Sequence, residues 1–183
     1  MAPAQSVSPK LARLSRVMAV LSVAGMVVIP LMVAGAFLYP DSTQWLMFNI
    51  SHTGASLTAA IPVQYRIDAL VCEIVPLGFI EWALWSLAKV FAHYARGEVF
   101  TAEPLRLLNN VARALFLGVL ADMVMEAPIS FLLTYASGPG HRAISVGFGS
   151  DDVARLFVAG AVLVIARVMS EARRVADENA GFV

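Results

Sequence analysis

The sequence predicts an all-α integral membrane protein, a bundle of four helices with both termini in the cytoplasm. The first observation behind this prediction is composition: 59% of the 183 residues are hydrophobic and 14% are charged, with a mean hydropathy of +0.75. Soluble domains are about 45–50% apolar and about 25% charged. The interior of a 183-residue protein cannot bury this excess of apolar residues. We therefore expect lipid to cover the apolar residues that remain on the surface. The other two observations are the spacing of long apolar segments and the placement of the basic residues.

The clearest membrane-spanning segment covers about residues 16–39, because the sequence from Val17 to Pro40 carries no charge. Roughly 20 apolar residues are needed to cross a bilayer. A cleaved signal peptide is the alternative, since basic residues precede this segment. Such peptides have apolar regions of about 7–15 residues, and this one is longer. We therefore favour a retained membrane helix.

Three further spans are expected at about 67–91, 110–135 and 152–170. The last is the weakest, because only Leu156 to Ala166 is free of charge. It can cross only if the flanking arginines reach outward to the interface or find partners. The four spans form a single membrane domain over residues 1–183, joined by an outer loop at 40–66 and a cytoplasmic connection at 93–108, with a cytoplasmic tail at 171–183.

The orientation follows from the basic residues in short loops, which favour the cytoplasmic side. With the N-terminus inside, three of the thirteen basic residues fall towards the outside: Arg66, Arg142 and Arg155. The other ten fall on the cytoplasmic side: Lys10, Arg13, Arg16, Lys89, Arg96, Arg106, Arg113, Arg167, Arg173 and Arg174. Both termini are therefore expected inside.

The cytoplasmic connection has the pattern of a turn followed by an amphipathic helix. Gly97 favours a turn, and Thr101 is a suitable cap before an acidic first helical turn. Apolar residues then recur at helical spacing and continue into the third span. The tail continues the fourth helix to about Asn179–Gly181, since glycine commonly ends helices. The polar residues of these two segments form a candidate cytoplasmic contact surface: Arg106, Asn109, Asn110, Arg113, Arg173 and Arg174.

Four carboxylates interrupt two of the apolar spans. Ionisable groups inside a membrane cost about 2.5–3.5 kcal/mol each, so they usually face protein or water and have partners. Estimates of depth along each helix place Arg155 at the level of Glu126 and Glu73, so we expect Arg155 to pair with one of these two. Glu81 and Asp122 would then lie close together near the middle of the membrane.

Two close carboxylates at that depth cannot both be charged at low cost. One interpretation is a structural clasp that fixes helix register, with one ion pair and one shared proton. The other is a proton or cation site formed by Glu73, Glu81, Asp122 and Glu126. Oxygen ligands alone suit a hard cation better than zinc or copper. No organic cofactor is predicted, and Cys72, the single cysteine, excludes an intrachain disulfide.

The segment from Arg96 to Glu103, followed by Leu105 and Leu108, resembles a signature of the domain of unknown function 2975 family. The tail from Met169 to Asn179 is similar to that family's closing pattern. The resemblance rests on the second half of the chain and, in the first half, on span layout alone. It implies a small bacterial inner-membrane protein of four helices without an established activity. It also implies a partner, because family members often occur beside a small helix-turn-helix regulator.

The leading hypothesis is a non-enzymatic membrane protein that senses or regulates through a cytoplasmic partner. The first alternative is a small proton- or cation-coupled transporter or channel-like subunit, and the second is a scaffold subunit of a membrane complex. A homo-oligomer fits any of the three. An enzyme is not expected, because no histidine metal motif and no glycine-rich phosphate loop is present. With zero net charge, direct binding of nucleic acid is not expected either.

Overall fold

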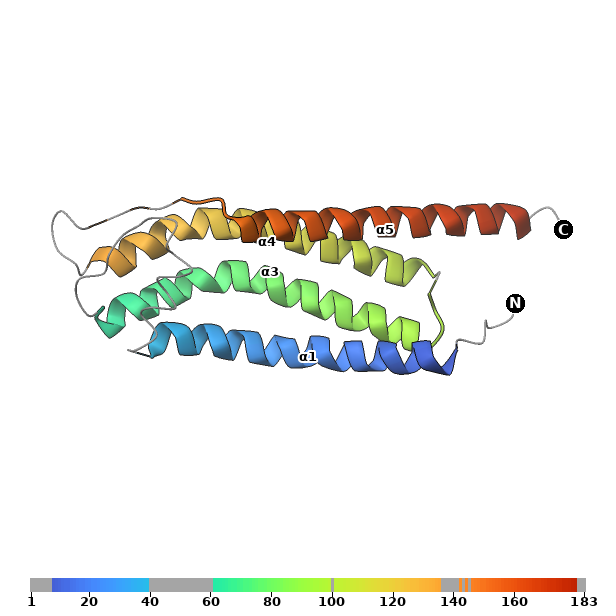
Figure 1. The fold of residues 1–183 in the computed structure, drawn as a ribbon, viewed down its shortest axis with the longest axis horizontal. Helices are drawn as coiled ribbons and strands as arrows, with labels where there is room; N and C mark the ends of the chain where they lie inside the picture. The colour runs from blue at the N-terminus through green and yellow to red at the C-terminus, as the bar shows by residue number, and fades with distance from the viewer. Residues whose placement is uncertain are drawn as a thin grey trace. The chain divides into compact units, whose positions relative to one another are not determined.

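The computed structural model describes residues 8–39, 61–99, 101–135, 142, 144 and 146–180, and these residues form four helices and their connections. The helices are α1 (Pro9–Leu38), α3 (Val63–Ala95), α4 (Ala102–Tyr135) and α5 (Ser150–Ala180), labelled in Figure 1. The predicted all-α class with four helices is confirmed for this part of the chain. Each predicted span runs along one helix.

The helix ends follow local sequence. Ser8 caps α1, since its hydroxyl accepts a hydrogen bond from the amide of Leu11 at 3.4 Å and Pro9 takes the first helical position. The helix α5 continues to Ala180, as the glycine at 181 predicted. The helix α3 begins at Val63, four residues before the start of the predicted second span. Residues 40–60 of the predicted outer loop lie outside the described residues.

Three of the described helices are long and apolar enough to cross a membrane: α1, α4 and the stretch of α5 from Ser150 to Val175. The predicted fourth span, the weakest in sequence, is therefore among them. The helix α3, which carries Glu73 and Glu81, is not. Its crossing stays a prediction.

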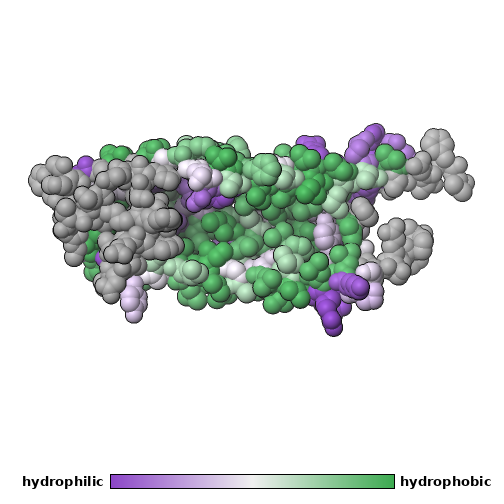
Figure 2. Space-filling view, in the orientation of Figure 1, coloured by the Kyte–Doolittle hydropathy of each residue, from purple (hydrophilic) through white to green (hydrophobic). Residues whose placement is uncertain are grey.

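Large apolar side chains lie on the surface of these helices. Val20 and Leu31 of α1 are each 67% exposed, and Phe157 of α5 is 77% exposed. Figure 2 shows apolar side chains over much of the visible helical surface. Soluble monomers rarely expose contiguous apolar patches larger than a few hundred Å². This surface suits contact with lipid chains.

The chain divides into two compact units, and the boundary falls inside every helix. Unit 1 contains residues Met1–Met26, Glu81–Phe116 and Leu156–Val183. Its core is a cluster of four buried residues, Val90, Leu107, Leu108 and Ala166. Three partly buried residues pack against this cluster: Tyr94, Val162 and Met169. The Tyr94 hydroxyl reaches the Met169 sulfur at 3.8 Å, so α3 and α5 are joined within this unit.

Unit 2 contains Val27–Ile80 and Leu117–Arg155. Its core comprises Phe37, Ile61, Ala69, Ile129 and Leu133. The side chain of Arg66 is buried at its edge and donates to two backbone carbonyls, that of Tyr39 at 2.7 Å and that of Ile61 at 3.1 Å. A cation suits the carboxyl end of α1, where helix carbonyls concentrate negative potential. Arg66 thus joins the end of α1 to the start of α3.

Candidate functional site

An ion-pair network in unit 2 connects α4 to the start of α5. The Arg155 guanidinium forms an ion pair with Asp122 of α4 through Nη1, and its Nη2 binds Asp152 Oδ1 at 2.8 Å. The side chains of Arg155, Asp122 and Asp152 are 37%, 25% and 11% exposed. At this partial burial the attraction is screened less than on an open surface, so the network holds the two helices in register.

The predicted partner of Arg155 was wrong: the arginine pairs with Asp122, not with Glu126 or Glu73. Asp122 and Glu126 are one helical turn apart, about 6 Å along the axis. An arginine side chain spans a similar length. Depth along a helix therefore could not distinguish these two acids, which lie on the same face of α4.

Glu126 and Asp152 bind the backbone that leads into α5. Glu126 Oε2 accepts a hydrogen bond from the amide of Gly147 at 2.6 Å, and Asp152 Oδ2 accepts one from the amide of Gly149 at 2.9 Å. The second bond is one half of a capping box, in which an acid three residues into the helix satisfies the amide of the cap.

The other two acids of the predicted cluster differ in their surroundings. Glu73 lies close enough to Asp122 and Arg155 to interact electrostatically with both. Glu81 belongs to unit 1, where its Oε1 is buried without a hydrogen-bond partner among the described residues. The predicted proximity of Glu81 to Asp122 stays a prediction. Within the described parts of the chain, no group of three or more histidine, cysteine or acidic side chains is placed to hold a metal ion.

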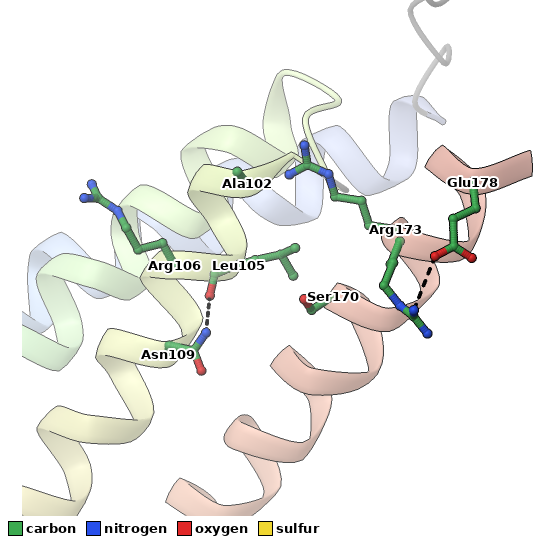
Figure 3. A pocket seen from close by; sticks show the side chains of 8 residues that line it. Ala102, Leu105, Arg106, Asn109, Ser170, Arg173 and Glu178 are labelled. Carbon is green, nitrogen blue, oxygen red and sulfur yellow. Dashed lines mark hydrogen bonds and ion pairs between the residues drawn. The ribbon is translucent and has the colours of Figure 1, made fainter. Parts of the chain in front are cut away.

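A groove of about 750 Å³ lies in unit 1 between the first turns of α4 and the last turns of α5 (Figure 3). Four of the six residues of the predicted contact surface line it: Arg106, Asn109, Arg173 and Arg174. Figure 3 shows the Arg173 side chain reaching towards Ala102 of α4. The remaining lining residues are Ala102, Leu105, Ser170 and Glu178. Two segments separated by more than 60 residues in sequence thus form one surface.

Arg106 and Arg174 of the groove each pair with acidic neighbours. Arg106 pairs with Glu103 at 2.6 Å, and Arg174 pairs with Glu171 and, at 3.3 Å, with Glu178. Each of these side chains is at least 46% exposed. Exposed pairs of this kind contribute about 0–1 kcal/mol. They position the arginines without holding them firmly.

The other two predicted contact residues lie outside the groove lining. Asn110 is half-buried and Arg113 is exposed, both further along α4. The Asn109 amide, by contrast, donates to the carbonyl of Leu105 at 3.1 Å, which keeps that side chain against its own helix at the groove wall. The structure therefore brings four of the six predicted contact residues together at the groove, and leaves Asn110 and Arg113 outside its lining.

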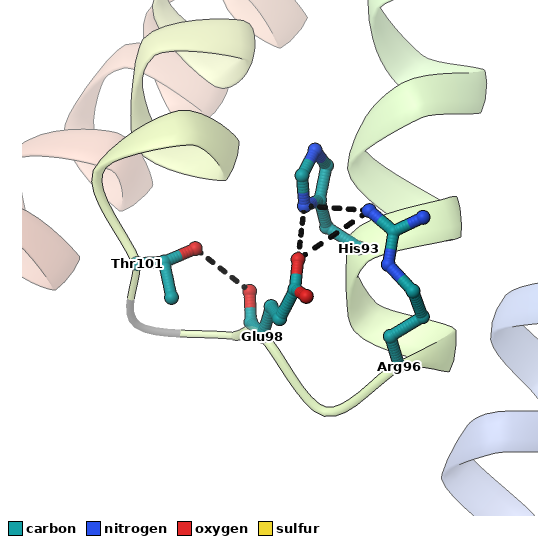
Figure 4. Close-up of polar contacts among 4 residues, drawn as sticks. All are labelled: His93, Arg96, Glu98 and Thr101. Carbon is teal, nitrogen blue, oxygen red and sulfur yellow. Dashed lines mark hydrogen bonds and ion pairs between the residues drawn. The ribbon is translucent and has the colours of Figure 1, made fainter. Parts of the chain in front are cut away.

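The connection from α3 to α4 contains a cluster of polar side chains (Figure 4). Glu98 Oε2 lies 2.5 Å from His93 Nδ1 and 3.4 Å from Arg96 Nη2. These hydrogen bonds hold the pKa of the Glu98 carboxyl below its usual range. The Thr101 hydroxyl donates to the Glu98 carbonyl at 3.3 Å. The cluster fixes where α4 begins relative to the end of α3.

Sequence reasoning missed several of these partners. Asp152 could have been found, because it precedes Arg155 by three residues and such pairs meet on a helix surface. The same spacing joins Glu103 to Arg106 and Glu171 to Arg174. Arg66 gave no signal, since its acceptors are backbone carbonyls, which every residue has.

Comparison with known proteins places the chain in a family. No curated protein and no solved structure matches it significantly. A family model described as "Protein of unknown function (DUF2975)" matches residues 4–181. The match includes the first half of the chain, where the sequence motifs gave only a similar layout. The chain belongs to the DUF2975 family.

Proposed function

We propose that this protein is a multi-pass protein of the bacterial inner membrane that senses or regulates through a cytoplasmic partner, without enzymatic activity. Three helices long and apolar enough to cross a bilayer support the membrane location. The distribution of basic residues supports a cytoplasmic position for both termini and for the connection from α3 to α4.

The observation that carries the proposal is the groove in unit 1. It gathers Arg106 from the start of α4 and Arg173 and Arg174 from the end of α5, two segments that the charge distribution assigns to the same side of the membrane. A polar surface built from two helix ends, next to the exposed tail of α5, suits contact with another protein. By family resemblance, that protein is a small helix-turn-helix regulator.

The network of Arg155, Asp122 and Asp152 has a different role in this proposal. Its arginine is shared by two acids, and Glu126 is bound to the backbone before α5. These contacts favour the structural clasp over a proton or cation path. The clasp holds α5, whose far end lines the groove.

Site-specific photo-crosslinking tests the partner. A photoreactive residue replaces Ala102 at the groove, and the regulator is co-expressed with the full chain. We expect a crosslink to the regulator from position 102. Leu14 of α1, which is also exposed and in unit 1, is the matched control position and should give none.

A reporter of the neighbouring genes tests the consequence. Deleting the protein, or changing both Arg173→Gln and Arg174→Gln, should shift reporter expression several-fold. The charge-matched variant with Arg13→Gln and Arg16→Gln should leave expression unchanged. If position 102 gives no crosslink and deletion leaves the reporter unchanged under every stress tried, the proposed regulatory function is wrong.

A further inference from the structure

We infer that the segment leading into α5 re-enters the membrane beside α4 and places its apolar side chains against lipid acyl chains. The described residues of this entry segment are Arg142, Ile144 and 146–149. The inference rests on the membrane location proposed above and not on the regulator. It concerns unit 2, which contains the entry segment, the first turn of α5 and α4 from Leu117 onward.

Two contacts show that the entry segment runs back along α4. The Arg142 Cζ atom lies 3.9 Å from the centroid of the Tyr135 ring, at the last residue of α4. Five residues later, the amide of Gly147 donates to Glu126, nine residues before Tyr135. Nine helical residues rise about 13 Å, a distance that five residues of chain can cover. The entry segment is therefore antiparallel to the end of α4.

The end of α4 belongs to the apolar part of that helix. Between Arg113 and Tyr135 its charged residues are Asp122 and Glu126. A helix from Arg113 to Tyr135 rises about 33 Å, which matches a hydrocarbon layer of about 30 Å. Tyrosines gather at membrane interfaces, so Tyr135 is placed at the outer one. Glu126 and the Gly147 amide bound to it then lie roughly 13 Å inward, and α5 begins below the membrane surface.

A non-helical backbone at this depth needs partners from the protein, because acyl chains accept no hydrogen bonds. Glu126 Oε2 accepts from the Gly147 amide at 2.6 Å, and Asp152 Oδ2 accepts from the Gly149 amide at 2.9 Å. Both glycines are half-buried. The carboxylates thus satisfy the backbone of the entry segment, which gives Glu126 a reason to stand inside an apolar span.

The residues that alternate with the two glycines are apolar and exposed. Ile144, Val146 and Phe148 are 70%, 63% and 53% exposed. The neighbouring helices expose apolar side chains as well, among them Val124 of α4 at 65% and Val153 of α5 at 54%. One apolar surface therefore continues from the helices onto the entry segment. Because this surface lies at the level of the hydrocarbon layer, acyl chains are its occupant.

Spin labels on the full chain in lipid nanodiscs of phosphatidylcholine and phosphatidylglycerol measure the depth. In a Cys72→Ser background, a nitroxide is attached at Val146→Cys or Phe148→Cys. The references are Val124→Cys in α4 and Glu103→Cys, an exposed residue in the first turn of α4. Electron paramagnetic resonance compares collisions with oxygen, which concentrates among acyl chains, and with a water-soluble nickel chelate. We expect oxygen collisions to exceed nickel collisions several-fold at 124, 146 and 148, and the reverse at 103.

Two variants of Glu126 test the contact with Gly147, each with the label at position 146. Glu126→Leu removes the acceptor for the Gly147 amide and should raise the nickel collisions of this label several-fold. Glu126→Gln keeps an acceptor oxygen and should leave them unchanged. The same variants labelled at Val124 should resemble the parent, which shows that α4 stays in the membrane.

A label at 146 that behaves like the one at 103, while the label at 124 stays in lipid, would overturn the inference and leave the membrane location intact. Nickel access at 124 as well would overturn both. A label at 146 that neither reagent reaches would show that protein covers this residue, which also overturns the lipid contact. An equal rise in nickel collisions in Glu126→Leu and Glu126→Gln would overturn the role of Glu126.

Discussion

At the scale of single residues, the most consequential contact is the pair of Arg155 and Asp122. This ion pair joins α4 to α5, and both of its side chains are partly exposed. Breaking a paired charge costs more than the pair contributes, because the remaining charge is left without its partner. Asp152 still neutralises part of the Arg155 charge, so the loss should be moderate.

We expect Asp122→Asn to lower the free energy of unfolding by about 1–3 kcal/mol, the cost of leaving a partly buried charged group without its partner. Reversible unfolding of the full chain in detergent micelles measures the change. A double-mutant cycle with Arg155→Gln should give a coupling energy of about 1 kcal/mol or more.

Glu103→Gln provides the matched control. It removes one acid from an exposed pair and should change stability by less than about 0.5 kcal/mol. A stable Asp122→Asn protein that loses proton or cation flux in proteoliposomes would contradict the clasp. That outcome would favour the transporter.

At the scale of elements, the end of α3 depends on one backbone conformation. Gly97 has a φ of 87°, and the amides of Gly97 and Glu98 bond to the carbonyls of Tyr94 and His93, each at 3.1 Å. This is a Schellman motif, in which a left-handed residue ends the helix. A side chain at that residue would crowd the following carbonyl.

Gly97→Ala should therefore lower the free energy of unfolding by about 1–2 kcal/mol. The same substitution at Gly160, inside α5, is the control. A Cβ there meets no heavy atom within 4 Å, so Gly160→Ala should be neutral or stabilising by up to about 1 kcal/mol. Equal effects at both sites in thermal unfolding would show that Gly97 does not need its left-handed conformation.

At the scale of the whole molecule, the number of crossings decides the topology. An even number of crossings places both termini on one side, and an odd number places them on opposite sides. Of the four described helices, only α3 falls outside the group that is long and apolar enough to cross. The distribution of basic residues predicts that α3 crosses as well.

Cysteine labelling in intact cells tests this topology. In a Cys72→Ser background, Arg142→Cys should react with a membrane-impermeant thiol reagent. Glu103→Cys should react only after the membrane is permeabilised. If the N-terminus is inside and α3 does not cross, the two positions exchange their accessibility, because each then lies on the other side of the membrane.

The described helices were predictable because helix formation depends on local sequence. Ser8 and Pro9 begin α1, and the continuous apolar spacing after Thr101 made α4 one long helix. The candidate contact surface was predictable in part, since Arg106 and Arg174 are polar residues at the ends of apolar helices. That they line one groove followed from the pairing of α4 with α5, which composition does not encode.

The sequence by itself determined the helical class, the apolar surface and the asymmetric placement of basic residues, because each depends on composition or on spacing along one helix. Only the tertiary structure decided that Arg155 binds Asp122 and that Arg66 joins the end of α1 to the start of α3. Spacing fixes which residues share a helix face but leaves the rotation and offset of neighbouring helices open. Long arginine side chains widen that choice further, because one guanidinium can reach acceptors on more than one helical turn.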